Sequence, residues 1–232
     1  MGRRELALDV LLPICAVIAL AAMLLLVTGT WPPLVAVESG SMEPNVVRGD
    51  LIILTAPERV AGTGTDEWGI VTAGAASEAG GVDAAPAESA YSRLGGPGDV
   101  IVFQPPGRTG SPILHRVAFA VEADENWYDR ADDRFHSADD CAELANCPAP
   151  HAGYITIGDD NARYDQADDI APPVKPEWIQ GKAQLRVPLV GWLRLGVDAA
   201  VDAVFAVTTQ ALSGVSPFVS EPGIMNPITP RG

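Results

Sequence analysis

The chain has 232 residues, enough for one membrane anchor and one domain with a substantial core, and this length argues against a second independent domain. The formal net charge is −15, so repulsion disfavours nucleic acid and anionic lipid headgroups as partners. High net charge also keeps a protein soluble where salt screens strongly, which predicts a protein from a halophile; an ordinary acidic extracellular domain is the alternative.

An apolar run near the N-terminus predicts a transmembrane anchor. Residues 10–27 are 18 consecutive apolar residues, long enough to cross about 30 Å of hydrocarbon. A removable secretion signal is the alternative, but its apolar region usually covers only about 7 to 15 residues, and no Ala-x-Ala site follows this run. We therefore expect a retained anchor over residues 10–30.

Charges on the two sides of the run predict its orientation. Arg3 and Arg4 precede it, and Glu38 is the first charge after it. Because basic residues mark the cytoplasmic side, residues 1–9 are expected in the cytoplasm and a domain of residues 31–195 outside it. The expected location is the cell membrane, with a single pass.

The first segment beyond the anchor carries a candidate nucleophile. It reads "VAVESGSMEPNVVRGDLIIL", Val35 to Leu54, and Ser41 follows a glycine in its polar turn. In such a turn a serine side chain can be exposed while a backbone N–H points at a substrate oxygen. Most serines in turns only form local hydrogen bonds, so Ser41 needs a neighbouring base. The part from Val46 to Leu54 is typical of strand, turn, strand.

The second segment carries a candidate base. After a Gly- and Ala-rich surface insertion at about residues 56–94, Gly95 to Gly107 predicts a strand that ends in a Pro-Pro-Gly turn. Ser111 to Glu122 predicts a second strand that pairs with it as a hairpin. His115 lies in the middle of that strand, with its two neighbours on the opposite face. A histidine in a strand is more often structural, so its partners decide its role.

Two cysteines lie in a second, Asp-rich insertion at about residues 124–153. Cys141 and Cys147 are on the expected outer side, where disulfides persist, so a disulfide is the favoured interpretation. Two alternatives stay open: a zinc site completed by His136 and His151, or two free thiols. Cys15, inside the anchor, is expected only to pack.

The third segment, "YITIGDDNARYDQ", is predicted to be a strand running into a polar loop. Asp159, Asp160 and Asp165 are candidates for the carboxylate that would fix the tautomer of a catalytic imidazole. Any one of them alone is more typical of turn chemistry. Residues 181–195 predict another strand or two.

The domain as a whole is predicted to be mostly β. Helical periodicity is almost absent between residues 35 and 190, which indicates coiled antiparallel β-sheet, arranged as a pair of sheets. A C-terminal helix and tail are expected over 196–232, where Asp198 and Asp202 would share one helix face. This helix could lie on the bilayer, pack on the domain or cross as a second span, although each charge at the bilayer centre costs about 2.5 to 3.5 kcal/mol.

Taken together, the three segments resemble signal peptidase I in motif order and spacing. The resemblance rests on "SGSMEP" with "GDL", on "GDVIVF" leading to "ILHRV", and on "IGDDNARYD" closing on "VPLVGWL". It is closest to the archaeal and endoplasmic-reticulum branch, and the acidic surface is similar to that of haloarchaeal members. It covers residues 35–54 and 98–195 and does not extend to the tail.

The resemblance implies a role for each motif residue. Ser41 would be the nucleophile, His115 the general base and Asp165 the carboxylate that orients it, with Asp159 in support. Ser39 and Met42 would serve substrate and oxyanion binding. One departure is that the usual "GDNN" reads "GDDN", so Asp160 replaces an amide. The bacterial branch uses a lysine as its base. The two lysines of this chain, Lys175 and Lys182, lie outside every motif, so neither is a candidate for that role.

The implied fold is an extracytoplasmic catalytic domain of the signal peptidase type, and the implied activity is that of a membrane-bound serine endopeptidase. It would remove signal peptides from exported preproteins without a cofactor, with the bilayer and the secretion translocon as further partners. Strands around 46–54 and 99–103 would line shallow apolar pockets for small residues. Two alternatives are a non-catalytic, membrane-anchored subunit that binds preproteins and a metal-dependent surface enzyme built on the histidines and cysteines of the second insertion.

Overall fold

The computed structural model describes residues 3–60, 64–78 and 91–196. The chain divides into two compact units, Met1–Leu193 and Arg194–Gly232, and every helix and strand named below belongs to the first. The predicted C-terminal helix and tail fall almost wholly outside the described residues.

The N-terminal helix α1 (Arg3–Thr28) contains the predicted anchor. Its segment Leu11–Thr28 has a mean hydropathy of 2.8 and is almost entirely exposed, so α1 is long and apolar enough to cross a membrane. The helix stops where Gly29 takes a positive φ of 71°. The guanidinium of Arg59 donates to the carbonyl of Leu26 at 3.0 Å, which caps the negative end of the helix dipole.

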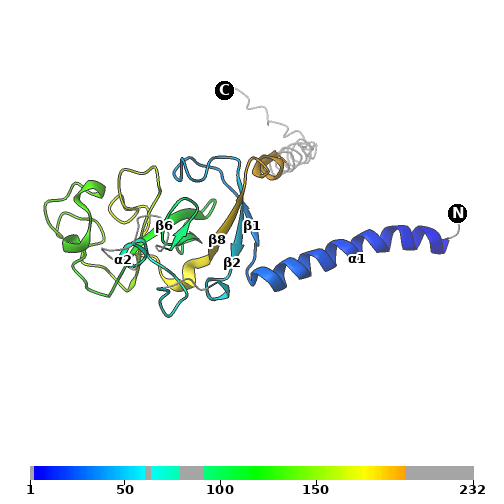
Figure 1. Cartoon of the computed structure of the whole chain (residues 1–232), viewed down its shortest axis with the longest axis horizontal. Helices are drawn as coiled ribbons and strands as arrows, with labels where there is room; N and C mark the ends of the chain where they lie inside the picture. The colour runs from blue at the N-terminus through cyan, green and yellow to red at the C-terminus, as the bar shows by residue number, and fades with distance from the viewer. Residues whose placement is uncertain (1–2, 61–63, 79–90, 197–232) are drawn as a thin grey trace, which may run out of the picture. The chain divides into compact units, whose positions relative to one another are not determined.

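The fold beyond α1 is built on a six-stranded antiparallel sheet in the order β1-β2-β8-β5-β6-β7, of which β1, β2, β6 and β8 are labelled in Figure 1. Three of its ladders shift register at a bulge, and bulges increase the twist of a sheet. The described strands therefore make one coiled sheet and a small ribbon, rather than the predicted pair of sheets. The strands are β1 (Leu34–Ala36), β2 (Leu51–Thr55), β5 (Val100–Phe103), β6 (Ile113–Val121), β7 (Gly153–Ile157) and β8 (Ile179–Val187), and the ribbon is β3 (Ser92–Arg93) with β4 (Gly96–Pro97).

Short helices occupy the connections. The predicted insertion at 56–94 contains η1 (Pro57–Arg59) and α2 (Ala73–Glu78), and α2 is too short to have shown helical periodicity in the sequence. The other connections contain η2 (Tyr128–Arg130), η3 (Asp133–Phe135) and η4 (Pro176–Trp178).

One strand prediction needs correction and three are confirmed. The hairpin is β5 with β6, in which Ile101 lies opposite His115, and the strand before the acidic loop is β7. The prediction of a strand, a turn and a second strand over 46–54 is wrong for the first strand. Val46 is fully buried in the loop before β2, and the strand that precedes β2 and pairs with it is β1. The prediction of a strand or two over 181–195 is confirmed by β8, and residues 191–196 are helical.

The core lies on both faces of the central strands. All four residues of β5 are buried, and their side chains alternate between two clusters. Val100 and Val102 pack with Met42 from the loop after β1, while Ile101 and Phe103 pack on the other face. The loop that carries Ser41 is thus fixed to the sheet by its own apolar side chains.

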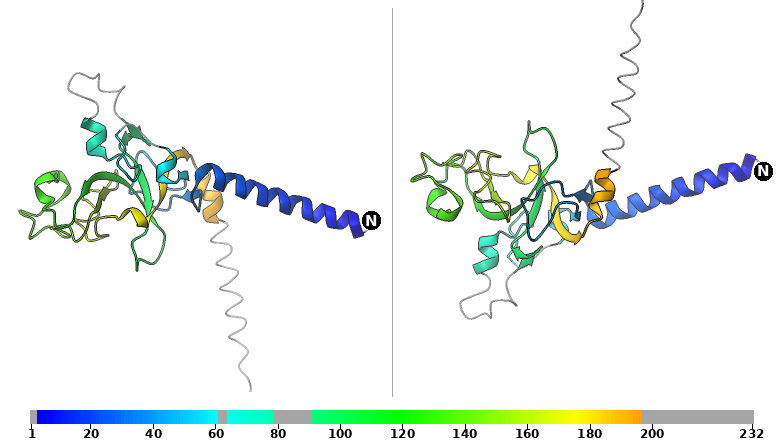
Figure 2. Two further views of the ribbon diagram at one scale, coloured as in Figure 1. Left: turned by 90° about the horizontal axis from the view of Figure 1, so that it is seen from below. Right: turned by 90° about the horizontal axis from the view of Figure 1, so that it is seen from above.

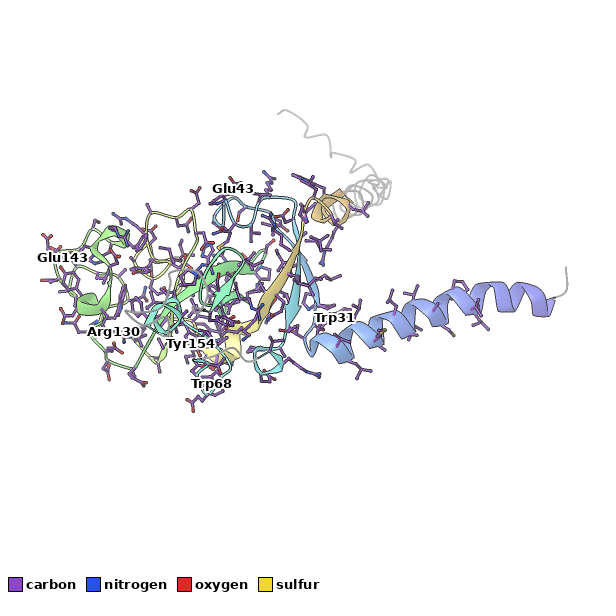
Figure 3. All side chains as sticks on the ribbon, in the orientation of Figure 1. Trp31, Glu43, Trp68, Arg130, Glu143 and Tyr154 are labelled. Carbon is purple, nitrogen blue, oxygen red and sulfur yellow. A yellow bond between two sulfur atoms is a disulfide. The ribbon has the colours of Figure 1, made fainter. Side chains whose placement is uncertain are left out.

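The segment between β6 and β7 forms a lobe of green loops at one end of the sheet (Figures 1 and 2). It holds Arg130 and Glu143, which are labelled in Figure 3. Although its surface is acidic, the lobe has an apolar base in which Trp127 is completely buried and contacts Phe119 and Tyr164 edge-on or tilted. The predicted insertion at 124–153 is therefore a packed part of the fold.

Candidate active site

Ser41 lies on a closed loop between β1 and β2, the nucleophile loop, residues 37–50. Its ends are joined because the Val37 N–H donates to the carbonyl of Asp50 and the Gly49 N–H donates to that of Val37, both at 2.9 Å. The buried carboxylate of Asp50 accepts the N–H of Val47 at 2.9 Å and so closes the turn from inside. The loop is held as a unit, which keeps the serine in place before any substrate binds.

His115 reaches Ser41 from the third residue of β6. Its Nε2 is 2.9 Å from the Ser41 Oγ, which is hydrogen-bonding distance. Because β6 is paired with β5 on one side and β7 on the other, the backbone that carries the imidazole is fixed at both edges. The His115 side chain is only 8% exposed, so bulk water has little access to it.

Asp165 holds the other imidazole nitrogen. Its Oδ2 lies 2.7 Å from His115 Nδ1, and the same oxygen accepts the hydroxyl of Thr156 at 2.6 Å. Asp165 is completely buried, and its own N–H donates to the carbonyl of Thr156. A carboxylate on Nδ1 keeps the proton on that nitrogen and leaves the Nε2 lone pair facing the serine, as proton transfer from Ser41 requires.

Asp159 binds elsewhere. Its two oxygens accept Nε and Nη2 of Arg116, each at 2.7 Å, and Oδ2 also accepts the side-chain N–H of Asn45 at 2.8 Å. Arg116 follows His115 on β6 and points to the opposite face, as strand alternation predicts. The second aspartate therefore ties the base-bearing strand to the nucleophile loop, and its hydrogen bonds do not go to the imidazole.

The acidic loop touches the nucleophile loop at a second point. The backbone N–H of Asp160 donates to the carbonyl of Ser41 at 2.9 Å. Gly158 makes this approach possible, because a Cβ there would lie 2.5 Å from the same carbonyl oxygen. The side chain of Asp160 is exposed, so replacing the usual amide leaves this contact intact.

Ser39 and Met42 differ in what they offer a substrate. The Ser39 hydroxyl is 3.2 Å from that of Ser41, so it can stand beside a developing negative charge. Met42 is 1% exposed and packs in the core under the loop. The Met42 side chain is thus an anchor of the loop and is not accessible to a substrate, so the predicted role of Met42 in oxyanion binding would fall to its backbone.

Sequence reasoning missed three residues that build this site: Asn45, Arg116 and Thr156. Alternation along β6 gave the direction of Arg116 but not its partner. Arg116 is also surrounded by backbone, since its Nη1 donates to the carbonyl of Arg93 at 2.9 Å and a Cβ on Gly96 would lie 2.8 Å from its Cζ. A threonine among the apolar residues of β7 was the only sequence signal for Thr156.

The lysine nearest to a motif is not available as a base. Lys182 is completely buried, and its ammonium group donates to Asp99 Oδ2 at 3.1 Å and to the carbonyls of Val60 and Gly69. Asp99 also accepts the hydroxyl of Tyr91 at 2.7 Å. Burial, followed by this hydrogen bond, raises the pKa of Tyr91 to about 12. The pair fastens the insertion after β2 to strand β8.

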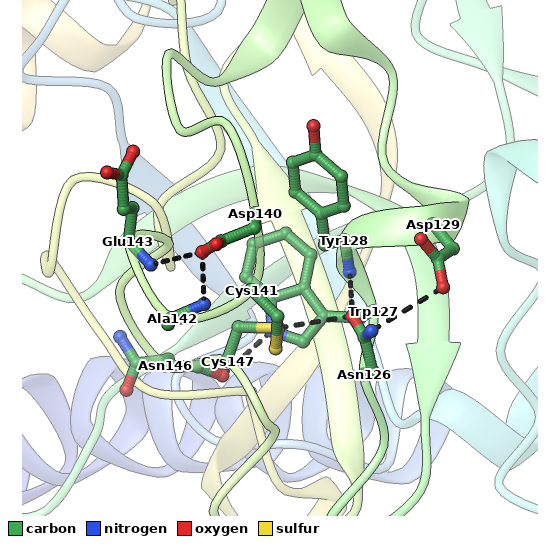
Figure 4. The surroundings of a disulfide bond; sticks show 10 residues. All are labelled: Asn126, Trp127, Tyr128, Asp129, Asp140, Cys141, Ala142, Glu143, Asn146 and Cys147. Carbon is green, nitrogen blue, oxygen red and sulfur yellow. Dashed lines mark hydrogen bonds between the residues drawn. A yellow bond between two sulfur atoms is a disulfide. The ribbon is translucent and has the colours of Figure 1, made fainter.

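The two cysteines of the lobe between β6 and β7 form a disulfide. Cys141 and Cys147 are joined, as Figure 4 shows, so the favoured sequence interpretation is confirmed. The zinc site proposed with His136 and His151 is wrong, since both thiols are used. Among the residues that the structure describes, no group of three or more His, Cys, Asp or Glu side chains could hold a metal ion.

Comparison of the sequence with models of known protein families and with curated proteins finds no match. A functional conclusion for this chain therefore depends on the geometry of Ser41, His115 and Asp165.

Proposed function

We propose that this chain is a membrane-bound serine endopeptidase of the signal peptidase I type, which removes signal peptides from exported preproteins. The supporting observation is the chain of hydrogen bonds from Ser41 Oγ to His115 Nε2, 2.9 Å, and from His115 Nδ1 to Asp165, 2.7 Å. A serine with a base in reach and a buried carboxylate behind that base is the arrangement that activates a hydroxyl for acyl transfer.

The proposed reaction follows from these contacts. Ser41 Oγ attacks the carbonyl carbon of the scissile peptide bond while His115 Nε2 takes the hydroxyl proton. The same nitrogen then protonates the leaving amine, and the signal peptide remains as an ester on Ser41. Water, deprotonated by His115, hydrolyses the ester. The Ser39 hydroxyl and the backbone N–H of Ser41 would stabilise the oxyanion, a contribution of about 3 to 4 kcal/mol per donor in comparable sites.

The position of Ser41 in the chain supports a substrate cut at the membrane. Ser41 is only ten positions after Trp31, and this stretch can span at most about 33 to 36 Å. Trp31 is 70% exposed, as an aromatic residue at the outer interface would be. In this proposal α1 is a single-pass anchor in the cell membrane, with its N-terminus in the cytoplasm and the domain outside. The secretion translocon would bring preproteins to it.

The test is processing of a labelled preprotein by membranes that carry the wild-type chain, Ser41→Ala or His115→Ala, at high and low salt. We expect each variant to lower the cleavage rate by about 10⁴- to 10⁶-fold. Ser92→Ala and His151→Ala serve as matched controls, because both residues lie outside the site. Equal processing by Ser41→Ala would favour the alternative, a non-catalytic subunit that binds preproteins.

A further inference from the structure

A cavity of about 150 Å³ lies in the lobe between β6 and β7, and it is lined by none of the residues of the proposed active site. One wall comes from the disulfide-closed loop 141–147, and another from the segment that carries Asp165. Its polar lining residues are His136, Ser137, Glu143 and Arg163, and its apolar lining is Leu144 with three alanines.

His136 is the unusual member of this lining. Its side chain is 2% exposed, and among the described residues neither ring nitrogen has a hydrogen-bond partner. The nearest carboxylate oxygen, on Asp133, is 3.7 Å from Nε2, which is beyond hydrogen-bonding distance. Buried polar atoms in native proteins nearly always meet a partner, and the cavity that His136 lines is where a bound group could supply one.

The charges around the cavity favour a cation. Glu143 lines the cavity with an exposed carboxylate, and the Asp133 carboxylate lies 3.7 Å from His136 Nε2. The opposing charge of Arg163 is already used, since its guanidinium pairs with Asp168 at 3.3 Å and donates to the Ser137 hydroxyl at 2.5 Å. An anion would meet uncompensated carboxylates there, whereas a cation would be attracted.

We propose that this cavity binds the primary ammonium group of a lysine side chain presented by a peptide. An ammonium group has three donors, which suit the imidazole lone pair and the Glu143 carboxylate together. The apolar lining matches the methylene stem of lysine, which is commonly buried against apolar surface. A metal ion fits less well, because the described residues supply no cluster of three ligands.

The wall that carries Glu143 is preformed. The disulfide closes its loop, and the backbone N–H groups of Ala142 and Glu143 both donate to Asp140 Oδ1, at 2.8 and 3.0 Å (Figure 4). The Glu143 carboxylate accepts the N–H of Asp139 through Oε2, which fixes the side chain toward the cavity edge. A preformed site binds without first having to order its own loops.

The test uses the full-length chain in detergent, labelled with ¹⁵N at its histidines. The chain has three histidines, so each imidazole can be followed by NMR. The probe is Nα-acetyl-lysine methylamide, and the norleucine analogue, which has a similar stem but no ammonium group, is the control. We expect saturable shifts of the His136 signals with the lysine probe only, and no shift of His151. Ethanolamine, which has the ammonium group without the stem, should bind at least tenfold more weakly.

Two variants complete the test. Glu143→Gln keeps the acceptor for Asp139 but removes the charge, and it should weaken lysine binding at least tenfold. Glu177→Gln removes one charge from an exposed site elsewhere and should leave binding unchanged. Equal shifts with the lysine and norleucine probes, no shift of His136, or equal affinity in wild type and Glu143→Gln would each overturn the proposal. A His136 response to Zn²⁺ alone would also overturn it, in favour of a metal site. None of these readouts is catalytic, so the outcome is independent of the proposed peptidase activity.

Discussion

Asp165 and Asp159 are two carboxylates from one short loop with different partners, and the difference gives them different roles. Asp165 is buried behind the imidazole, where Thr156 and His115 reach its Oδ2. Asp159 is taken by Arg116 and Asn45. From the sequence, either could have oriented His115, since the choice depends on how the loop turns after Gly158.

Asp165→Asn tests the role of the buried carboxylate. An amide fills the same space but cannot stabilise a protonated imidazole, and it can hold the ring in the wrong tautomer. We expect kcat to fall by about 10⁴-fold with little change in KM. The measurement is steady-state cleavage of a synthetic preprotein. Asp168→Asn is the matched control, because that carboxylate is on the surface. A loss below tenfold in Asp165→Asn would remove Asp165 from the mechanism.

Hydrogen bonds from Arg116 and Asn45 to Asp159 connect strand β6 to the nucleophile loop; we call this set of contacts the link Arg116–Asp159–Asn45. It helps to set the separation of Ser41 and His115, together with the packing of Met42 against the sheet and the contact between the Asp160 N–H and the Ser41 carbonyl. The loop motifs and the hairpin were predictable, because each lies in one continuous stretch of sequence. The link was not, because its three members come from three segments that meet only in the fold.

Asn45→Ala should loosen this link without touching the triad. We expect kcat to fall about 10- to 100-fold while KM stays nearly constant, since a small displacement of a nucleophile mainly lowers the chemical rate. Asn45→Asp should be worse, because it sets a second carboxylate against Asp159. Asn126→Ala, in the lobe, is the control. If Asn45→Ala changed KM alone, Asn45 would be a substrate contact and not a positioning residue.

The buried pair Lys182–Asp99 also joins separate elements, since Lys182 lies on β8 and Asp99 directly precedes β5. Lys182 Nζ lies 3.1 Å from Asp99 Oδ2, and both side chains are fully buried. Removing one charge would leave the other buried without its partner. Lys182→Met should therefore lower the free energy of unfolding by about 3 to 5 kcal/mol. Lys175→Met, which breaks a solvent-accessible pair with Glu177 and a contact with the Trp178 ring, should change it by less than about 1 kcal/mol. Denaturant unfolding measures both changes in the free energy of unfolding. Equal changes in the two variants would contradict a stabilising role for the buried pair.

For the molecule as a whole, the sequence predicted the apolar helix, the antiparallel β character and the disulfide. These features depend on local composition or on pairs close in the chain. The order of the six strands could not be predicted from the sequence. Strand β8 lies between β2 and β5 in the sheet, although it follows both by more than 70 residues in the chain. The three-residue strand β1 was also too short to carry an alternating pattern.

The net charge of −15 is a property of the whole chain, and it predicts a dependence on salt. Screening shortens from about 10 Å at 0.1 M to about 3 Å at 1 M salt, which weakens repulsion among the carboxylates. The melting temperature should therefore rise as KCl is raised over this range. Thermal unfolding followed by circular dichroism measures it, with sucrose as an uncharged control. A melting temperature that fell with KCl would contradict the interpretation of the acidic surface as an adaptation to salt.

The central claim is that the hydroxyl oxygen of Ser41 attacks the scissile peptide bond of a preprotein beside the membrane. The most direct measurement is single-turnover cleavage of a preprotein by purified full-length chain, wild type and Ser41→Ala, with the new N-terminus identified by mass spectrometry. The account predicts one cut after the signal peptide in the wild type and a rate about 10⁴- to 10⁶-fold lower in Ser41→Ala. The same cut at the same rate in both proteins would contradict it.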